Sequence, residues 1–182
     1  MEIVDQEGRQ MPRKCRVEIS FPEIDWAQSF HFSRLRGLSM EVRSFSFKLL
    51  HQILPNTNPE CSLCNSHQAE TPLHAIFLCQ YNSQAATALL SLTRPYANNI
   101  SAEKALLFDV AVVDTIYELP TMLVLATGMH FIWKNRCYKK RTELYHIRSE
   151  IECLVSLLRR SRPRQLREAG NMVFNSLANF PI

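Results

Sequence analysis

The stretch Cys61-Ser62-Leu63-Cys64 places two thiols three positions apart, and His74 and Cys79 follow it in the pattern C-x2-C-x9-H-x4-C. Cysteine thiolates and a histidine imidazole are ligands that Zn²⁺ prefers, and four of them complete a tetrahedral site. We therefore expect Cys61, Cys64, His74 and Cys79 to bind one Zn²⁺. Because four protein ligands leave no open coordination position, the expected zinc is structural and not catalytic.

The residues around this motif predict how it folds. Thr71-Pro72 has the pattern of a helix start, with Thr71 as the N-cap and Pro72 at the first helical position. Five residues on a regular α-helix rotate by about 500°, so His74 and Cys79 would point about 140° apart. The helix must therefore end or loosen before Cys79 if both side chains are to reach one ion. His67 is the alternative histidine ligand, and His74 is preferred because its local context is helical.

Composition limits the class of protein. The 182 residues fit one domain, or one domain with a small module, and a hydrophobic content of 46% is ample for a core. The four glycines are scattered, so the chain has no glycine-rich phosphate-binding loop. No secretory signal is recognisable and no apolar run reaches the ~20 residues of a membrane span. We expect a nuclear or cytoplasmic protein that is not secreted and has no membrane partner, in which the cysteines favour metal over disulfides.

The rest of the chain predicts a mainly α fold, a helical domain with an embedded CCHC zinc knuckle. Residues 1–30 are expected to form an extended or mobile N-terminal segment, in which residues 15–21 alternate like a strand. Residues 31–93 are expected to hold a helix and the knuckle, and residues 94–182 a C-terminal helical array. Capping residues, apolar periodicity and prolines predict helices over four ranges, 40–53, 83–92, 102–117 and 120–141.

Two apolar seams occupy the C-terminal part of the chain. The first has a spacing of 3, 4, 3 and 4 residues, which predicts a narrow face that packs on another helix. The second, in a last helix, repeats this kind of spacing. We interpret both as intramolecular packing, with dimerisation as the alternative. The seams consist of Leu144, Ile147, Ile151, Leu154 and Leu158, and of Leu166, Gly170, Val173 and Leu177.

Several motifs occur together in one order: Lys-Leu-Leu-His-Gln-Ile-Leu-Pro at residues 48–55, the C-x2-C pair, Glu70-Thr71-x2-His74, Cys79, and Ile-Trp-Lys-Asn-Arg at residues 132–136. This order resembles the zinc-binding region at the C-terminal end of LINE-type non-LTR retrotransposon reverse transcriptases. The resemblance implies an accessory region that grips template RNA or target DNA near a polymerase. The chain departs from that family because it contains no Asp-Asp pair and no recognisable nuclease carboxylate cluster, so we expect no enzymatic activity.

A basic cluster in the C-terminal half predicts nucleic-acid binding, because Lys and Arg neutralise phosphates and release counterions. Trp133, Tyr138 and Tyr145 lie beside it, and exposed aromatic rings stack on bases. The simpler interpretation is a solvated helix face, with Trp133 in the core. A second hypothesis is a zinc-stabilised module that docks a polymerase or another protein through its Leu144–Leu158 seam. The expected nucleic-acid ligands are Lys134, Arg136, Lys139, Lys140, Arg141, Arg159, Arg160, Arg162 and Arg164.

Overall fold

The structure is a computed structural model that describes residues 24, 26–32, 37–55, 60–64, 66–98 and 100–178. It confirms a mainly helical fold, and within these residues the only β pairing is an isolated bridge between Ala97 and Val112. The strand-like residues 15–21 lie outside the described part. The helices are α2 (Trp26–Phe32), α3 (Met40–Leu50), α4 (Ser83–Thr93), α5 (Ala102–Leu106), α6 (Glu118–Cys137), α7 (Leu144–Arg159) and α8 (Arg164–Leu177), with a π-helical turn at His74–Leu78 and a 3-10 turn at Thr115–Tyr117.

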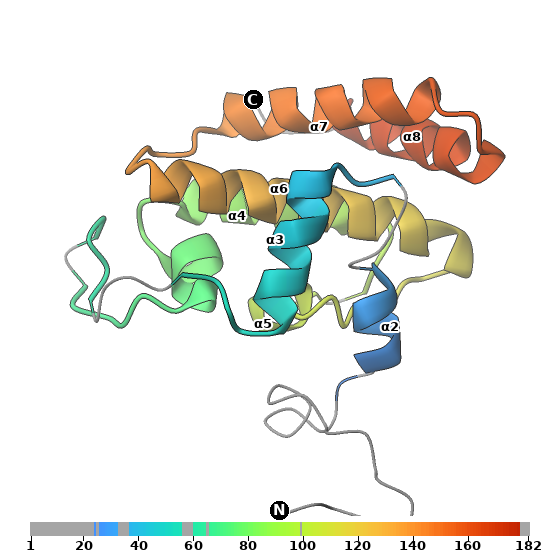
Figure 1. The fold of residues 1–182 in the computed structure, drawn as a ribbon. Coiled ribbons are helices and arrows are strands. Elements are labelled where there is room, and N and C mark those ends of the chain that lie inside the picture. The colour runs from blue at the N-terminus through green and yellow to red at the C-terminus, as the bar shows by residue number, and fades with distance from the viewer. Residues whose placement is uncertain are drawn as a thin grey trace, which may run out of the picture.

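Helix α6 is the centre of the molecule. Thirteen of its residues are buried, and its first half is buried on almost every side. Helices α3, α4, α7 and α8 and the π-helical turn all pack against it (Figure 1). One hydrophobic core extends from Trp26 to Leu177 and includes residues on both sides of residue 93. No helix in the described part of the chain has the length and apolar character needed to cross a membrane.

Gly128 allows α4 and α6 to lie close together. A Cβ atom built on this glycine would collide with the side chain of Leu89 on α4. Glycine in the middle of a helix costs about 0.5–1 kcal/mol relative to alanine. The sequence accepts this cost because the contact between the two helices leaves no room for a methyl group.

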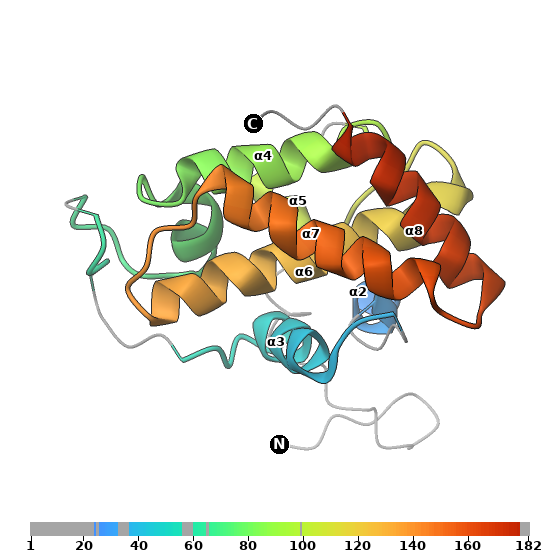
Figure 2. The same ribbon diagram turned by 90° about the horizontal axis from the view of Figure 1, so that it is seen from above.

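The apolar seams of α7 and α8 are buried within the molecule. Ile147, Ile151 and Leu158 are almost completely inaccessible to solvent, as is Val173 of α8. Figure 2 shows α7 lying across α4 and α6, with α8 beside its C-terminal half. The seams therefore pack inside this chain, and the Leu144–Leu158 face is not free to dock a partner.

Three helices end earlier than the sequence predicts. The helix expected over 40–53 ends at Leu50, the one over 102–117 ends at Leu106, and the one over 120–141 ends at Cys137. In each case a residue with positive φ follows, at Gln52, Phe108 and Lys139. The flanking backbone hydrogen bonds are those of the Schellman ending, in which glycine is the usual residue. Because none of the three residues is glycine, the sequence carries no local stop signal there.

Candidate metal centre

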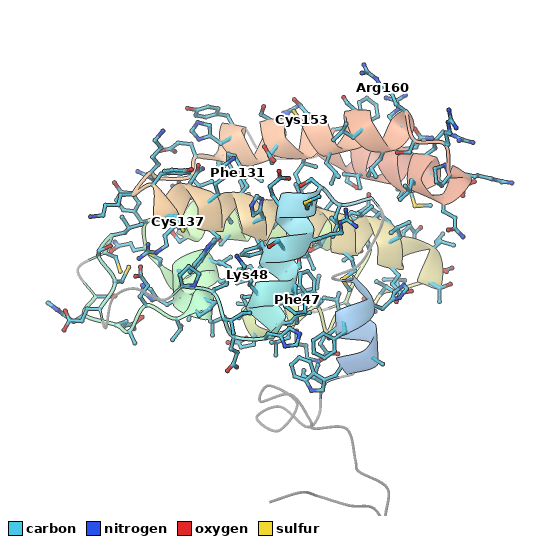
Figure 3. The ribbon with its side chains drawn as sticks, viewed as in Figure 1. Phe47, Lys48, Phe131, Cys137, Cys153 and Arg160 are labelled. Carbon is cyan, nitrogen blue, oxygen red and sulfur yellow. The ribbon has the colours of Figure 1, made fainter. Side chains whose placement is uncertain are left out.

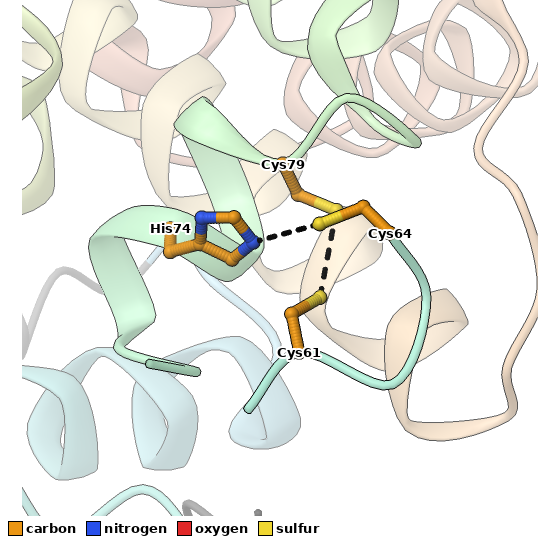
Figure 4. Close-up of side chains that lie close together, drawn as sticks. All are labelled: Cys61, Cys64, His74 and Cys79. Carbon is orange, nitrogen blue, oxygen red and sulfur yellow. Dashed lines mark hydrogen bonds between the residues drawn. The ribbon is translucent and has the colours of Figure 1, made fainter. Parts of the chain in front are cut away.

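Four side chains converge on one point beside the N-terminal end of α4. The ligand atoms of Cys61, Cys64, His74 and Cys79 all lie within 4.8 Å of one another (Figure 4). The Sγ atoms of Cys61 and Cys79 are 3.8 Å apart, and Cys64 Sγ is 3.3 Å from His74 Nε2. A tetrahedral ion with bonds of about 2.3 Å to sulfur separates two sulfurs by about 3.8 Å. The Cys3His group therefore has dimensions that could hold a metal ion.

A π-helical turn brings His74 and Cys79 together. Residues His74–Leu78 form this turn, and the Cys79 N–H donates to the His74 carbonyl at 2.6 Å. A hydrogen bond from residue i+5 to residue i widens the helix, so these two residues face the same side. The helix does loosen before Cys79, as the ligand spacing requires. Thr71 begins the segment as predicted, because its Oγ1 accepts the His74 N–H at 3.1 Å.

The structure selects His74 over His67. The Nδ1 atom of His74 lies 2.9 Å from Gln68 Oε1, so Nδ1–H donates to that oxygen and the Nε2 lone pair faces the three sulfurs. Metal-binding histidines commonly have such a partner, which fixes the tautomer and the ring orientation. The His67 side chain is 82% exposed and contacts Glu60 instead. Sequence reasoning missed Gln68, because no spacing rule marks a residue that orients a ligand.

Without a metal ion the cysteines differ in acidity. Burial raises the pKa of the Cys79 thiol to about 12, and the nearby Cys61 adds to this effect. At Cys64 burial also acts to raise the pKa, but hydrogen bonds from the Ser66 side chain and backbone outweigh it and lower the pKa to about 6. A thiol like Cys79 keeps its proton at neutral pH unless a cation replaces it. Metal binding at this group would therefore release protons and weaken in acid.

A buried ion pair joins α6 to the segment that carries the Cys3His group, residues 60–64 and 66–81, which we call the metal loop. Arg136 and Glu70 are in direct contact, and their side chains are only 8% and 1% exposed. Glu70 lies between the C-x2-C pair and His74, whereas Arg136 lies in the last turn of α6. The prediction that Arg136 contacts nucleic acid is therefore wrong, because its guanidinium is committed to Glu70 inside the molecule. The sequence could not reveal this, because the two residues meet only in the folded chain.

The remaining predicted basic residues are exposed and form two clusters. Lys134, Lys139, Lys140 and Arg141 lie at the C-terminal end of α6. The second cluster lies where α7 ends and α8 begins, and it consists of Arg159, Arg160, Arg162 and Arg164. Figure 3 shows Cys137, next to the first cluster, and Arg160 of the second cluster toward opposite sides of the molecule. At 1.5 Å per residue the intervening α7 separates the clusters by about 24 Å.

The three aromatic residues near the first cluster have different environments. Trp133 is 6% exposed and belongs to the core, so it offers no face to a base. Tyr138 and Tyr145 are 66% and 64% exposed. They flank the turn that joins α6 to α7, on either side of Lys139, Lys140 and Arg141.

Comparison with known proteins found no matching protein family, no matching curated protein and no matching solved structure. The resemblance to the zinc-binding region of LINE-type reverse transcriptases therefore stays a prediction from the motifs.

Proposed function

We propose that this chain is a non-catalytic nucleic-acid-binding domain in which the Cys3His group binds one Zn²⁺. The observation that carries the proposal is the position of the exposed Lys139-Lys140-Arg141 turn. It begins three residues after Arg136, whose buried pairing with Glu70 anchors the end of α6 to the metal loop. A metal-stabilised segment thus holds a basic surface in place.

The chemistry of the ligand set supports zinc. Three thiols and one imidazole whose ligand atoms lie within 4.8 Å of one another favour Zn²⁺ over Mg²⁺ or Ca²⁺, which prefer oxygen ligands. The four side chains would saturate the ion, so its contribution is to stabilise the fold. The hydrogen bond from His74 to Gln68 would hold the imidazole in the orientation needed for binding.

The charge of the first cluster supports nucleic acid as the ligand. Lys139 and Lys140 are exposed and form no ion pair with any acidic side chain in the described ranges. The nearby acids are already engaged, since Glu143 pairs with Arg141 and Glu70 pairs with Arg136. Unpaired cations on a fixed turn are suited to phosphate contacts. The motif order shared with LINE-type reverse transcriptases favours the same ligand class.

Salt dependence tests the proposal. Binding of a fluorescent RNA or DNA oligonucleotide is measured by anisotropy over a series of salt concentrations. We expect the affinity to fall steeply as salt rises, and the variant K139A/K140A/R141A to reduce the log–log slope by about 1.4, as loss of the two single-strand phosphate contacts of the unpaired lysines requires. Its zinc content, measured by mass spectrometry, stays at one equivalent because no metal ligand is changed.

A matched variant controls for loss of charge. R43A/K48A/K104A removes the same number of exposed charges from α3 and α5, away from the proposed surface. We expect it to change the slope much less. If the two triple variants reduce the slope equally, binding depends on the overall charge of the protein and not on this surface. No binding by the unaltered protein even at low salt would exclude the nucleic-acid function.

A further inference from the structure

We propose that the turn between α6 and α7 is a base-stacking site that selects unpaired nucleic acid over duplex. We call residues 138–145 the tyrosine–lysine turn. This inference rests on the proposed nucleic-acid function. It adds that the ligand is unpaired nucleic acid and that the first basic cluster, not the second, binds it. Tyr138 and Tyr145 supply the stacking surfaces, while Lys139 and Lys140 supply the phosphate contacts.

Exposure singles out the two tyrosines. Among residues whose exposure the structure gives, Tyr138 and Tyr145 are the most exposed aromatic side chains. Tyr96, by contrast, is 5% exposed, and its hydroxyl donates to the Met172 carbonyl. The next most exposed ring is Phe174, and the guanidinium of Arg159 lies 4.9 Å from the centre of that ring. Both tyrosines are more exposed than Phe174; within the described residues Tyr138 has no ring or cation stacked on it, whereas the His146 ring lies 4.0 Å from Tyr145.

The turn that carries the tyrosines is held in one shape. The N–H groups of Lys139 and Lys140 donate to the carbonyls of Arg136 and Asn135, each at 2.9 Å. The Asn135 side-chain amide donates to Thr142 Oγ1 at 3.3 Å, and Thr142 is almost fully buried. A surface that is ordered before binding loses less conformational entropy when a ligand arrives. The turn is thus preorganised as a platform.

Contacts outside the turn add to this order. The Arg141 guanidinium donates to Gln84 Oε1 on α4 at 3.3 Å and also pairs with Glu143. The Tyr145 ring lies 4.0 Å from the ring of His146, with the two planes tilted by 40°. Helix α4 and the first turn of α7 therefore support the tyrosine–lysine turn from two sides.

The second basic cluster is less suited to this role because two of its four arginines, Arg159 and Arg164, are engaged within the protein. Arg164 pairs with Glu168 at 2.7 Å, and Arg167 donates to the carbonyls of Ser161 and Arg162. Arg159 is occupied by Phe174, so that ring is already covered. The α6–α7 end combines two exposed lysines with two exposed tyrosine rings, whereas the α7–α8 end offers one exposed ring, Phe174, with a guanidinium already over it.

Stacking explains the preference for unpaired bases. Bases in a duplex stack on one another and hide their faces, whereas unpaired bases can lie on an aromatic ring. One stacked base raises affinity roughly 5- to 150-fold in single-strand-binding proteins, with little dependence on base identity. Lysine contacts with phosphate act on both forms. The contributions of the tyrosines and of the lysines can therefore be distinguished by comparing single-stranded with duplex probes.

The test compares three variants on two probes. The probes are a labelled 16-nucleotide RNA without self-complementarity and the same strand paired with its complement. We expect Y138A/Y145A to lose tenfold or more of its affinity for the single strand with little change for the duplex. Y138F/Y145F keeps the affinity because the rings remain, and K139A/K140A weakens both probes. A DNA strand of the same sequence shows whether the 2′-hydroxyl contributes.

Each other outcome overturns a defined claim. If Y138A/Y145A leaves single-strand binding unchanged while K139A/K140A reduces it, the stacking site fails and the nucleic-acid function stands. If Y138A/Y145A weakens both probes equally, the turn does not select unpaired bases. If the unaltered protein binds neither probe, the proposed function itself fails. Photocrosslinking of 5-iodouridine RNA to the unaltered protein gives an independent check, since crosslinks that avoid Tyr138 and Tyr145 also contradict the proposal.

Discussion

His74 and His67 show how two histidines in one short segment can have different roles. His74 is buried, faces the sulfurs through Nε2 and is oriented by Gln68. His67 has positive φ, is exposed and contacts Glu60. Sequence spacing allowed either one to complete the ligand set. Burial and the position of Gln68 separate them, because a metal ligand needs a fixed orientation and a partner for its second nitrogen.

Single substitutions check this assignment. We expect H74A and C64S to reduce bound metal well below one equivalent, because each removes one of four ligands. H67A keeps about one equivalent and is the matched control. Q68A retains the ligands but weakens metal affinity roughly 10- to 100-fold, as loss of an orienting partner does. Metal content by mass spectrometry and competition with a chelator give both quantities. Loss of metal in H67A but not in H74A would show that His67 is the ligand.

At the scale of elements, the buried Glu70–Arg136 pair joins the segment that leads into the π-helical turn to the end of α6. Removing one partner leaves the other charge buried and unpaired, which costs about 3–5 kcal/mol. We therefore expect E70A to lower the free energy of unfolding by about this amount in urea titrations. The same replacement in an exposed pair is the control, since E152A, which loses the partner of Arg148, changes stability by less than about 1 kcal/mol.

A double variant distinguishes the cost of an unpaired buried charge from the contribution of the intact ion pair. E70M/R136M replaces both charges with apolar side chains, and we expect it to be more stable than E70A because no buried charge remains. Equal destabilisation by E70A and E152A would mean that the Glu70–Arg136 pair is solvated in solution. The prediction that the metal loop is anchored to α6 would then be wrong.

At the scale of the whole molecule, most of the core lies outside the metal loop. Helices α4, α6, α7 and α8 bury their apolar faces against one another, whereas the described part of residues 60–81 contributes only Ala75, Ile76 and Phe77 to the buried members of this core. If the Cys3His group binds zinc as proposed, we expect its removal with a chelator to unfold residues 60–81 and to leave most of the helical signal in circular dichroism. Hydrogen exchange locates the change. Full loss of helix on chelation would show that the metal supports the whole fold.

The sequence by itself determined the mainly helical fold, the ligand spacing, the Thr71 cap and the faces of α7 and α8. These features are local, because helical period, capping and short-range spacing are properties of neighbouring residues. Only the tertiary structure decided the choice of His74, the role of Gln68 and the burial of Arg136. The tertiary structure also ended three helices with a positive-φ residue that is not glycine, namely Gln52, Phe108 and Lys139. Such features depend on which distant side chains and backbone groups pack against each residue. The local sequence pattern does not specify these long-range contacts.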